Sequence, residues 1–177
     1  MSSEKSMRNA GRSNVQEMVI AALFIALVYV CTWQVQIRLP FMGTGGLIHL
    51  GNLPLFLGAF LFGRKTGAIC GAFGMALFDI TSGWTAWAPF TFIIVGFMGY
   101  AVGWFAEKGP LKNVHVNNAA AILVAIIIKV VGYYFAELVL TGNWIAPFGS
   151  IPGNIIQVGV AGAVVFLVIE KLKKYVH

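Results

Sequence analysis

Charged residues are scarce in this chain of 177 residues. Only 10% of them are Asp, Glu, Lys or Arg, whereas about a quarter of an average soluble domain is charged. The apolar share is 59% and the mean hydropathy is +0.84, and the apolar residues form repeated runs of near-spanning length. These runs lack the apolar–polar alternation of a membrane β-barrel. The composition therefore predicts an all-α membrane protein with one helical bundle.

Several signatures of catalysis, metal binding and secretion are also missing. The chain has no GxxxxGK[ST] loop for ATP, no HExxH and no paired-Asp metal motif, and its apolar segments have no Ser or Cys beside a basic partner. Cys31 and Cys70 fall toward opposite membrane faces in the topology below and have no metal-ligand neighbours. We therefore expect neither a disulfide nor a metal site, and no cofactor. The polar N-terminal segment precedes an apolar run that is too long for a signal-peptide core.

Six apolar segments predict a bundle of six transmembrane helices. Pro40 and three glycines interrupt any helix after the first segment. A tryptophan-containing turn at 83–89 separates the third segment from the fourth, and another at 141–147 separates the fifth from the sixth. We expect a cytoplasmic tail at 1–14, a single six-helix transmembrane domain at 15–170 and a basic cytoplasmic tail at 171–177. The predicted spans are about 15–37, 47–63, 66–82, 89–106, 119–140 and 150–169.

The basic residues set the expected orientation. Six spans place both termini on one side, and ten of the twelve Lys and Arg residues then lie on that side. Arg38 alone lies opposite, and Lys129 lies within a span. Because cytoplasmic loops carry an excess of Lys and Arg, the N- and C-termini are predicted to be cytoplasmic. The same pattern accounts for the net charge of +6 without a nucleic-acid partner.

Polar side chains within the spans gather in their outer halves. Lys129, Tyr133 and Glu137 lie at i, i+4 and i+8, so they share one helix face, while Asp79 comes just before the outer turn that holds Trp84. A charge at the centre of a span costs about 2.5–3.5 kcal/mol on insertion scales, so these groups need a cavity or partners. The candidate substrate-binding residues are His49, Asn52, Asp79, Trp84, Trp87, Lys129, Tyr133, Glu137, Asn154 and Gln157.

Each of these residues has a simpler explanation when it is taken alone. Asp79 and Lys129 could form a structural ion pair, and Trp84, Trp87 and Trp144 could belong to an interfacial aromatic belt. A pair explains at most two of the three charges, whereas a polar, aromatic-lined cavity that opens outward explains all of them. The inner half is mostly apolar and offers no polar path, which predicts that the protein captures a solute but does not conduct it alone.

Small residues mark two helix-packing faces. Gly67 and Gly71 form a GxxxG in the third span, which allows close approach of a neighbouring helix. Ala22 and Ala26 form an AxxxA in the cytoplasmic half of the first span, with no polar neighbour. The AxxxA is a candidate docking face for another membrane protein, although small-xxx-small pairs also occur inside bundles.

The chain resembles the substrate-binding S components of energy-coupling factor (ECF) vitamin transporters over nearly its whole length. The similarity rests on six spans, the AxxxA of the first span, and the motifs GLIHLGN at 46–52, FGRKTGA at 62–68 and WAPFTFII at 87–94, with Asp79 between the last two. The last three features resemble the subgroup that includes riboflavin-type and hydroxymethylpyrimidine- or pyridoxine-type S components.

The resemblance implies the binding subunit of an ABC-type importer in the bacterial plasma membrane, not an enzyme. It implies a membrane coupling protein and two cytoplasmic ATPases as partners, with Ala22 and Ala26 packed on the coupling protein. It also implies that the loop at 38–46 covers the bound vitamin and that the subunit topples to bring its pocket to the cytoplasm. Hydroxymethylpyrimidine or a vitamin B6 form is the favoured ligand, while riboflavin stays open, as does pantothenate because of Lys129.

Two other classes of protein stay open as alternatives to a transporter subunit. His49, Asp79, Lys129 and Glu137 could act as acid–base residues of a small membrane enzyme for lipid or isoprenoid substrates, although no catalytic motif accompanies them. A purely structural subunit would not need so many charges in the outer half. Copurification with an ATPase complex separates the transporter from both.

Overall fold

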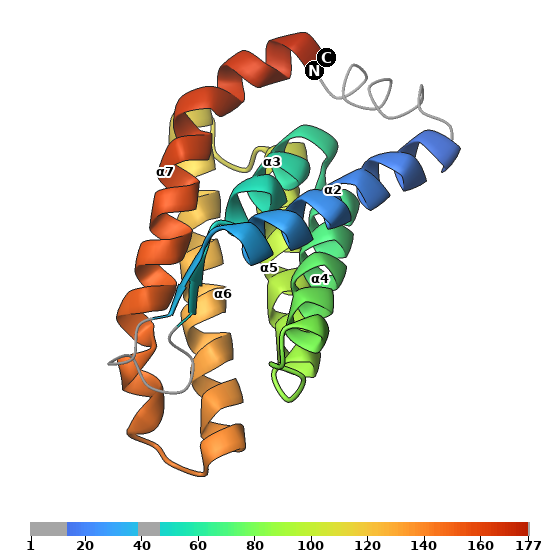
Figure 1. The fold of residues 1–177 in the computed structure, drawn as a ribbon. Helices are drawn as coiled ribbons and strands as arrows, with labels where there is room; N and C mark the ends of the chain where they lie inside the picture. Colours follow the sequence, from blue (N-terminus) through green and yellow to red (C-terminus); the bar gives the residue numbers. More distant parts are fainter. Residues whose placement is uncertain (1–13, 39–46, 177) are drawn as a thin grey trace.

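Six α-helices make up most of the described part of the chain (Figure 1). The computed structural model describes residues 14–38 and 47–176. Two short strands and a 3-10 helix, η1 (Ala146–Gly149), complete the regular secondary structure of these residues. The prediction of an all-helical membrane protein with six helices is therefore confirmed. The helices are α2 (Asn14–Gln34), α3 (Asn52–Phe62), α4 (Arg64–Thr81), α5 (Ala88–Lys108), α6 (Val114–Thr141) and α7 (Ile151–Val176).

The helices form two pairs with a short helix between them. In Figure 1, α6 and α7 run side by side along one edge of the bundle and α4 and α5 along the other. α3 packs against α4, α5 and α7, while α2 crosses α3 and α4 obliquely. The start of α2 and the end of α7 lie at one end of the bundle, here called the terminal end. The α4–α5 and α6–α7 turns lie at the opposite end, here called the turn end.

The helices differ in how far they can reach across a membrane. α2, α5, α6 and α7 are long and apolar enough to cross one, and α4 has 18 residues. α3 has only 11 residues, which at 1.5 Å per residue reach about 17 Å and fall short of the roughly 30 Å hydrocarbon core. The predicted second span at 47–63 is therefore not one helix.

The first part of that predicted span is a strand. β1 (Gln36–Arg38) pairs antiparallel with β2 (Leu47–His49), and Ile37 lies opposite Ile48. Isoleucine favours a pleated backbone, and the ladder satisfies backbone groups where the chain has left α2. α2 accordingly ends at Gln34 rather than at the predicted residue 37.

α6 and α7 extend beyond their predicted limits at the terminal end. The Asn113 side chain caps α6 by accepting hydrogen bonds from two N–H groups of its first turn, at 2.9 and 3.3 Å. α7 continues through the predicted basic tail to Val176, because Leu172 and Val176 pack against the core and no Gly or Pro interrupts residues 163–176. The basic residues from 171 to 174 are thus part of a helix.

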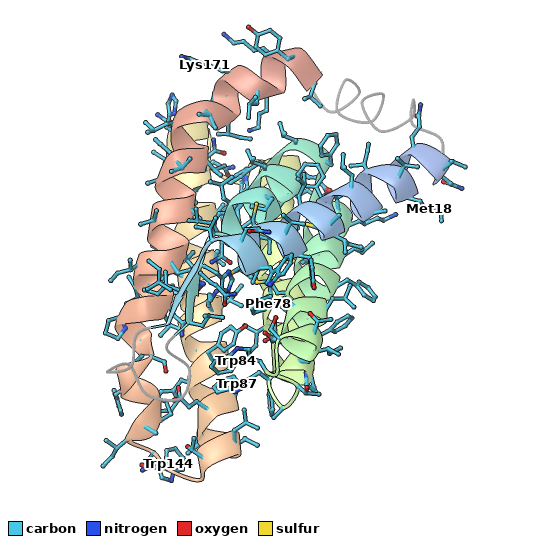
Figure 2. All side chains as sticks on the ribbon, viewed as in Figure 1. Met18, Phe78, Trp84, Trp87, Trp144 and Lys171 are labelled. Atoms are coloured by element: carbon cyan, nitrogen blue, oxygen red, sulfur yellow. The ribbon has the colours of Figure 1, made fainter. Side chains whose placement is uncertain are left out.

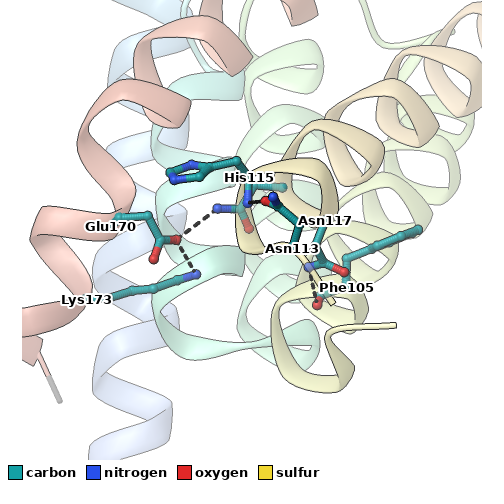
Figure 3. A network of polar contacts seen from close by, with 7 residues as sticks. Phe105, Asn113, His115, Asn117, Glu170 and Lys173 are labelled. Carbon is teal, nitrogen blue, oxygen red and sulfur yellow. Dashed lines mark hydrogen bonds and ion pairs between the residues drawn. The ribbon is translucent and has the colours of Figure 1, made fainter. Parts of the chain in front are cut away.

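A polar network joins α5, α6 and α7 near the terminal end (Figure 3). Glu170 Oε1 accepts hydrogen bonds from Asn118 Nδ2 and from Lys173 Nζ, each at 2.9 Å. Asn117 Nδ2 donates to the carbonyl oxygen of Phe105 at 3.0 Å. These hydrogen bonds tie the three helices together at this end.

α4 and α5 meet at small residues. A side chain on Gly67 would lie 2.5 Å from the carbonyl oxygen of Gly99, and one on Gly71 would lie 2.9 Å from that of Val95. The GxxxG of the sequence therefore faces α5, and only hydrogen at these positions permits so close an approach. The tight pair ends in the turn that carries Trp84 and places it beside the functional site.

Candidate functional site

A cavity of about 50 Å³ lies at the turn end of the bundle, between β2 and helices α4, α5, α6 and α7. Eight of the ten predicted binding residues line it. Leu47 and Thr91, which the sequence did not single out, also contribute. The ten lining residues are Leu47, His49, Asp79, Trp84, Trp87, Thr91, Lys129, Tyr133, Asn154 and Gln157.

Helical spacing brings these side chains to one place. Lys129 and Tyr133 lie one turn apart on α6 and so point the same way. Thr91 lies one turn after Trp87, which is the N-cap of α5. The same spacing explains why Thr91 joins the site, and it is the signal that could have identified this residue from the sequence.

Aromatic rings form one wall of the cavity. Trp87 stacks on Tyr133 with ring centroids 6.2 Å apart and planes inclined at 30°, and Trp84 meets Trp87 edge-on at 6.4 Å. Figure 2 shows Trp84 and Trp87 together on the inner side of the α4–α5 pair, while Trp144 lies far from them on the α6–α7 turn. Trp144 is 67% exposed, as expected for an interfacial belt. The other two tryptophans face a site for a planar ligand.

Two buried charges face this cavity without forming an ion pair. The exposed fractions of Lys129 and Asp79 are 2% and 8%. Within residues 14–38 and 47–176, Lys129 Nζ and Asp79 Oδ2 have no hydrogen-bond partner, and no ion pair within 4.0 Å joins the two side chains. Lys129 Nζ lies 5.5 Å from the centroid of the Tyr133 ring. The alternative in which the two charges satisfy each other through a direct ion pair is therefore absent from this part of the chain.

Two further groups add hydrogen-bond donors to the cavity. Gln157 is 2% exposed, and its Nε2 has no partner among the described residues. His49 Nδ1 accepts the Gly51 N–H at 3.2 Å, which places the proton of a neutral imidazole on Nε2. Buried polar groups in native proteins are nearly always hydrogen-bonded, and leaving one unsatisfied costs about 1–3 kcal/mol. The cavity therefore offers Asp79, Lys129 and Gln157 to a polar ligand or to water.

Thr91 connects two walls of the cavity. It is 2% exposed, and its Oγ1 lies 3.0 Å from the Tyr133 hydroxyl. Thr91 and Asp79 line the same cavity from α5 and α4. The Thr91 hydroxyl thus contacts α6 within the cavity wall.

Asn52 and Glu137 do not line the cavity. Glu137 is fully buried, and its Oε2 accepts a 2.6 Å hydrogen bond from the hydroxyl of Ser150, which precedes α7. Asn52 is fully buried at the start of α3, and within the described ranges neither atom of its amide has a hydrogen-bond partner. The structure therefore groups eight of the predicted residues and separates these two from them.

The candidate docking residues lie on the side of α2 that faces away from the bundle. Ala22 and Ala26 are exposed, whereas Ala21, Phe24 and Val28 turn toward the bundle. The AxxxA therefore lies on the exposed side of α2. The predicted covering loop at 38–46 lies, apart from its first residue, outside the described residues.

Comparison with known proteins assigns a family and a fold. The family described as ECF-type riboflavin transporter, S component, matches residues 12–174. An uncharacterized protein of Pyrococcus woesei is 36% identical over 110 residues, which cover 60% of this chain and 69% of that protein. The thiamine precursor transporter HmpT of Lactococcus lactis subsp. cremoris (strain MG1363) is 28% identical over 166 residues, or 94% of this chain and 92% of HmpT.

A solved structure has the same fold. The S component of a bacterial ECF transporter superposes with a TM-score of 0.65 at 21% sequence identity, over 92% of this chain and 98% of that one. The family match covers α2 to α6 and all but the last two residues of α7, and four of these six helices are long and apolar enough to cross a membrane. The chain therefore belongs to the S components of ECF transporters: it is a multi-pass membrane protein and a transporter's binding subunit, not an enzyme.

Proposed function

We propose that this S component captures hydroxymethylpyrimidine, a precursor of thiamine, in the cavity at its turn end. The observation that carries the proposal is the Lys129 ammonium group. It is buried, faces the cavity beside the stacked Trp87 and Tyr133 rings, and has no hydrogen-bond partner in the described part of the chain. A ligand with ring nitrogens would supply acceptors to this donor and stack on the aromatic wall.

The size and polarity of the cavity favour a ligand with one ring. A volume of about 50 Å³ must expand even for a pyrimidine, and it is far from the size of a three-ring flavin. Pantothenate would match the charge of Lys129, but it has no ring to stack on Trp87. The similarity to the thiamine precursor transporter HmpT across 94% of the chain supports the same choice. A vitamin B6 form, which also has one ring, is the closest competitor.

We propose further that both chain ends face the cytoplasm and that the cavity faces outward. Lys5, Arg8, Arg64 and Lys65 are among the ten basic residues that this orientation places inside. The turn end then receives ligand from outside the cell, and the exposed AxxxA face of α2 docks on a coupling protein that works with two ATPases. The S component carries the ligand site, and the partner subunits hydrolyse ATP.

Uptake in a heterologous host tests this function. Cells that express the S component together with a coupling module should accumulate labelled hydroxymethylpyrimidine, and cells that lack either part should not. Lys129→Met should abolish uptake at low ligand concentration while the protein remains in the membrane. If uptake of hydroxymethylpyrimidine does not depend on this chain but uptake of a B6 vitamer or riboflavin does, the proposed ligand is wrong.

A further inference from the structure

The cavity has many hydrogen-bond donors and one side chain that can only accept. Lys129 Nζ is a donor only, Gln157 Nε2 donates, and His49 donates from Nε2 because its Nδ1 accepts the Gly51 N–H. Asp79 is the acidic residue among the side chains that line the cavity. As a carboxylate, it can accept hydrogen bonds but cannot donate one.

Asp79 presents an unengaged oxygen atom to the cavity. Asp79 Oδ2 is buried and has no hydrogen-bond partner within residues 14–38 and 47–176. The hydroxyl groups of Thr91 and Tyr133 lie 3.0 Å apart and can satisfy each other on the α5 and α6 walls. Asp79 Oδ2 is therefore left to a ligand.

We propose that Asp79 selects ligands that present an amino group at the α4 side of the cavity and rejects analogues with a carbonyl there. This inference rests on the proposed function and adds to it the chemical feature of the ligand that Asp79 recognises. Asp79 contacts the ligand as a specificity residue.

The physical basis is the mismatch that a carbonyl would create. An oxo group opposite Asp79 Oδ2 brings two acceptors together, and neither then has a donor inside a buried site. Sites built to hydrogen-bond a particular polar group reject analogues that lack it far more strongly than apolar pockets reject a missing methylene. Conversion of the amino group to an oxo group also turns the neighbouring ring nitrogen from an acceptor into a donor. The Lys129 and Gln157 side of the cavity then loses an acceptor as well.

The test compares two ligands by isothermal titration calorimetry on the purified full chain. Hydroxymethylpyrimidine carries the amino group, and its oxo analogue carries a carbonyl in the same place. Wild type should bind the amino compound at least about 100-fold more tightly than the oxo compound. Asp79→Asn should reduce this ratio to about tenfold or less, since a rotated amide can donate to a carbonyl.

The outcomes separate this inference from the proposed function. Equal binding of both compounds to wild type would overturn the selection by Asp79 and leave hydroxymethylpyrimidine capture intact. An unchanged ratio in Asp79→Asn would do the same. Binding of neither compound to wild type would overturn the proposed ligand and this inference together.

Discussion

Ser150 Oγ donates a 2.6 Å hydrogen bond to Glu137 Oε2, which ties α6 to the start of α7 outside the cavity. The two buried acids at the turn end therefore differ in their surroundings. Glu137 is engaged by a neighbouring element, whereas Asp79 Oδ2 has no partner in the described ranges and lines the cavity. The difference predicts opposite behaviour on substitution.

Glu137→Gln should lower the stability of the ligand-free protein more than it weakens ligand binding. A hydrogen bond to a charged group contributes about 1.5–3 kcal/mol, and Ser150→Ala should cost a similar amount. Thermal unfolding in detergent of both single variants and the double variant measures this. We expect the double variant to be less destabilised than the sum of the singles, because both remove one bond. Strict additivity would show that the bond between Ser150 and Glu137 does not contribute to stability. A large loss of affinity in Glu137→Gln with unchanged stability would make Glu137 a ligand contact instead.

Lys129→Met should show the reverse pattern. It removes a buried ammonium group that has no partner within residues 14–38 and 47–176, so the ligand-free protein should be as stable as wild type or more stable. Ligand binding should fall by about tenfold or more, because the ligand loses a donor in a buried site. Melting curves with and without ligand report both quantities on one sample. A strongly destabilised Lys129→Met with wild-type affinity would indicate a structural role for the charge.

Gly99→Ala should destabilise the α4–α5 pair. A methyl group there would clash with the backbone carbonyl of Gly67 on the facing helix, and such overpacking typically costs about 1–3 kcal/mol. Gly159→Ala is the matched control, since nothing lies within 4 Å of the added methyl at that helical position. Its melting temperature should equal or exceed that of wild type. Equal effects of the two substitutions would show that close packing of α4 on α5 is not required.

Ala22→Trp and Ala26→Trp should abolish uptake and copurification with the ATPase module while ligand binding stays intact. Both alanines are exposed on α2, and a bulky side chain there would hold a docked helix away. Ile127→Trp on α6, where the native side chain is 54% exposed, is a control for the added size. If the two alanine variants transport normally, this face of α2 is lipid-facing surface and not the docking site.

The sequence predicts much of the fold because hydrophobic length and basic residues are local signals. Five of the six predicted spans match one helix each, within a few residues at most ends. The prediction of the second span failed because an apolar segment can form either a helix or a strand. Residues 47–49 form a strand that pairs with residues 36–38. That pairing depends on a partner strand elsewhere in the sequence. α7 is likewise longer than predicted, because Leu172 packs against the core. The local sequence pattern does not reveal that contact.

Residues of the candidate site could be predicted where their depth in the membrane and their helix face are enough to bring them together. Lys129, Tyr133 and Asp79 follow from such reasoning, and all three line the cavity. Glu137 shares their helix face, but one more turn carries it past the cavity to Ser150, a partner that only the tertiary fold supplies. Thr91 was not predicted because it is uncharged, and an uncharged threonine in an apolar span does not by itself require a polar partner. Its importance comes from the contact with Tyr133.

The most direct test of the central claim is a calorimetric titration of the purified chain with hydroxymethylpyrimidine, without ATP or partner subunits. We predict saturable binding of one ligand per chain, with quenching of tryptophan fluorescence that is largely lost in Trp87→Phe, because Trp87 forms the stacking wall. A B6 vitamer, riboflavin and pantothenate should bind far more weakly. Absence of heat and of quenching with hydroxymethylpyrimidine, on protein that is folded by its melting curve, would contradict the account.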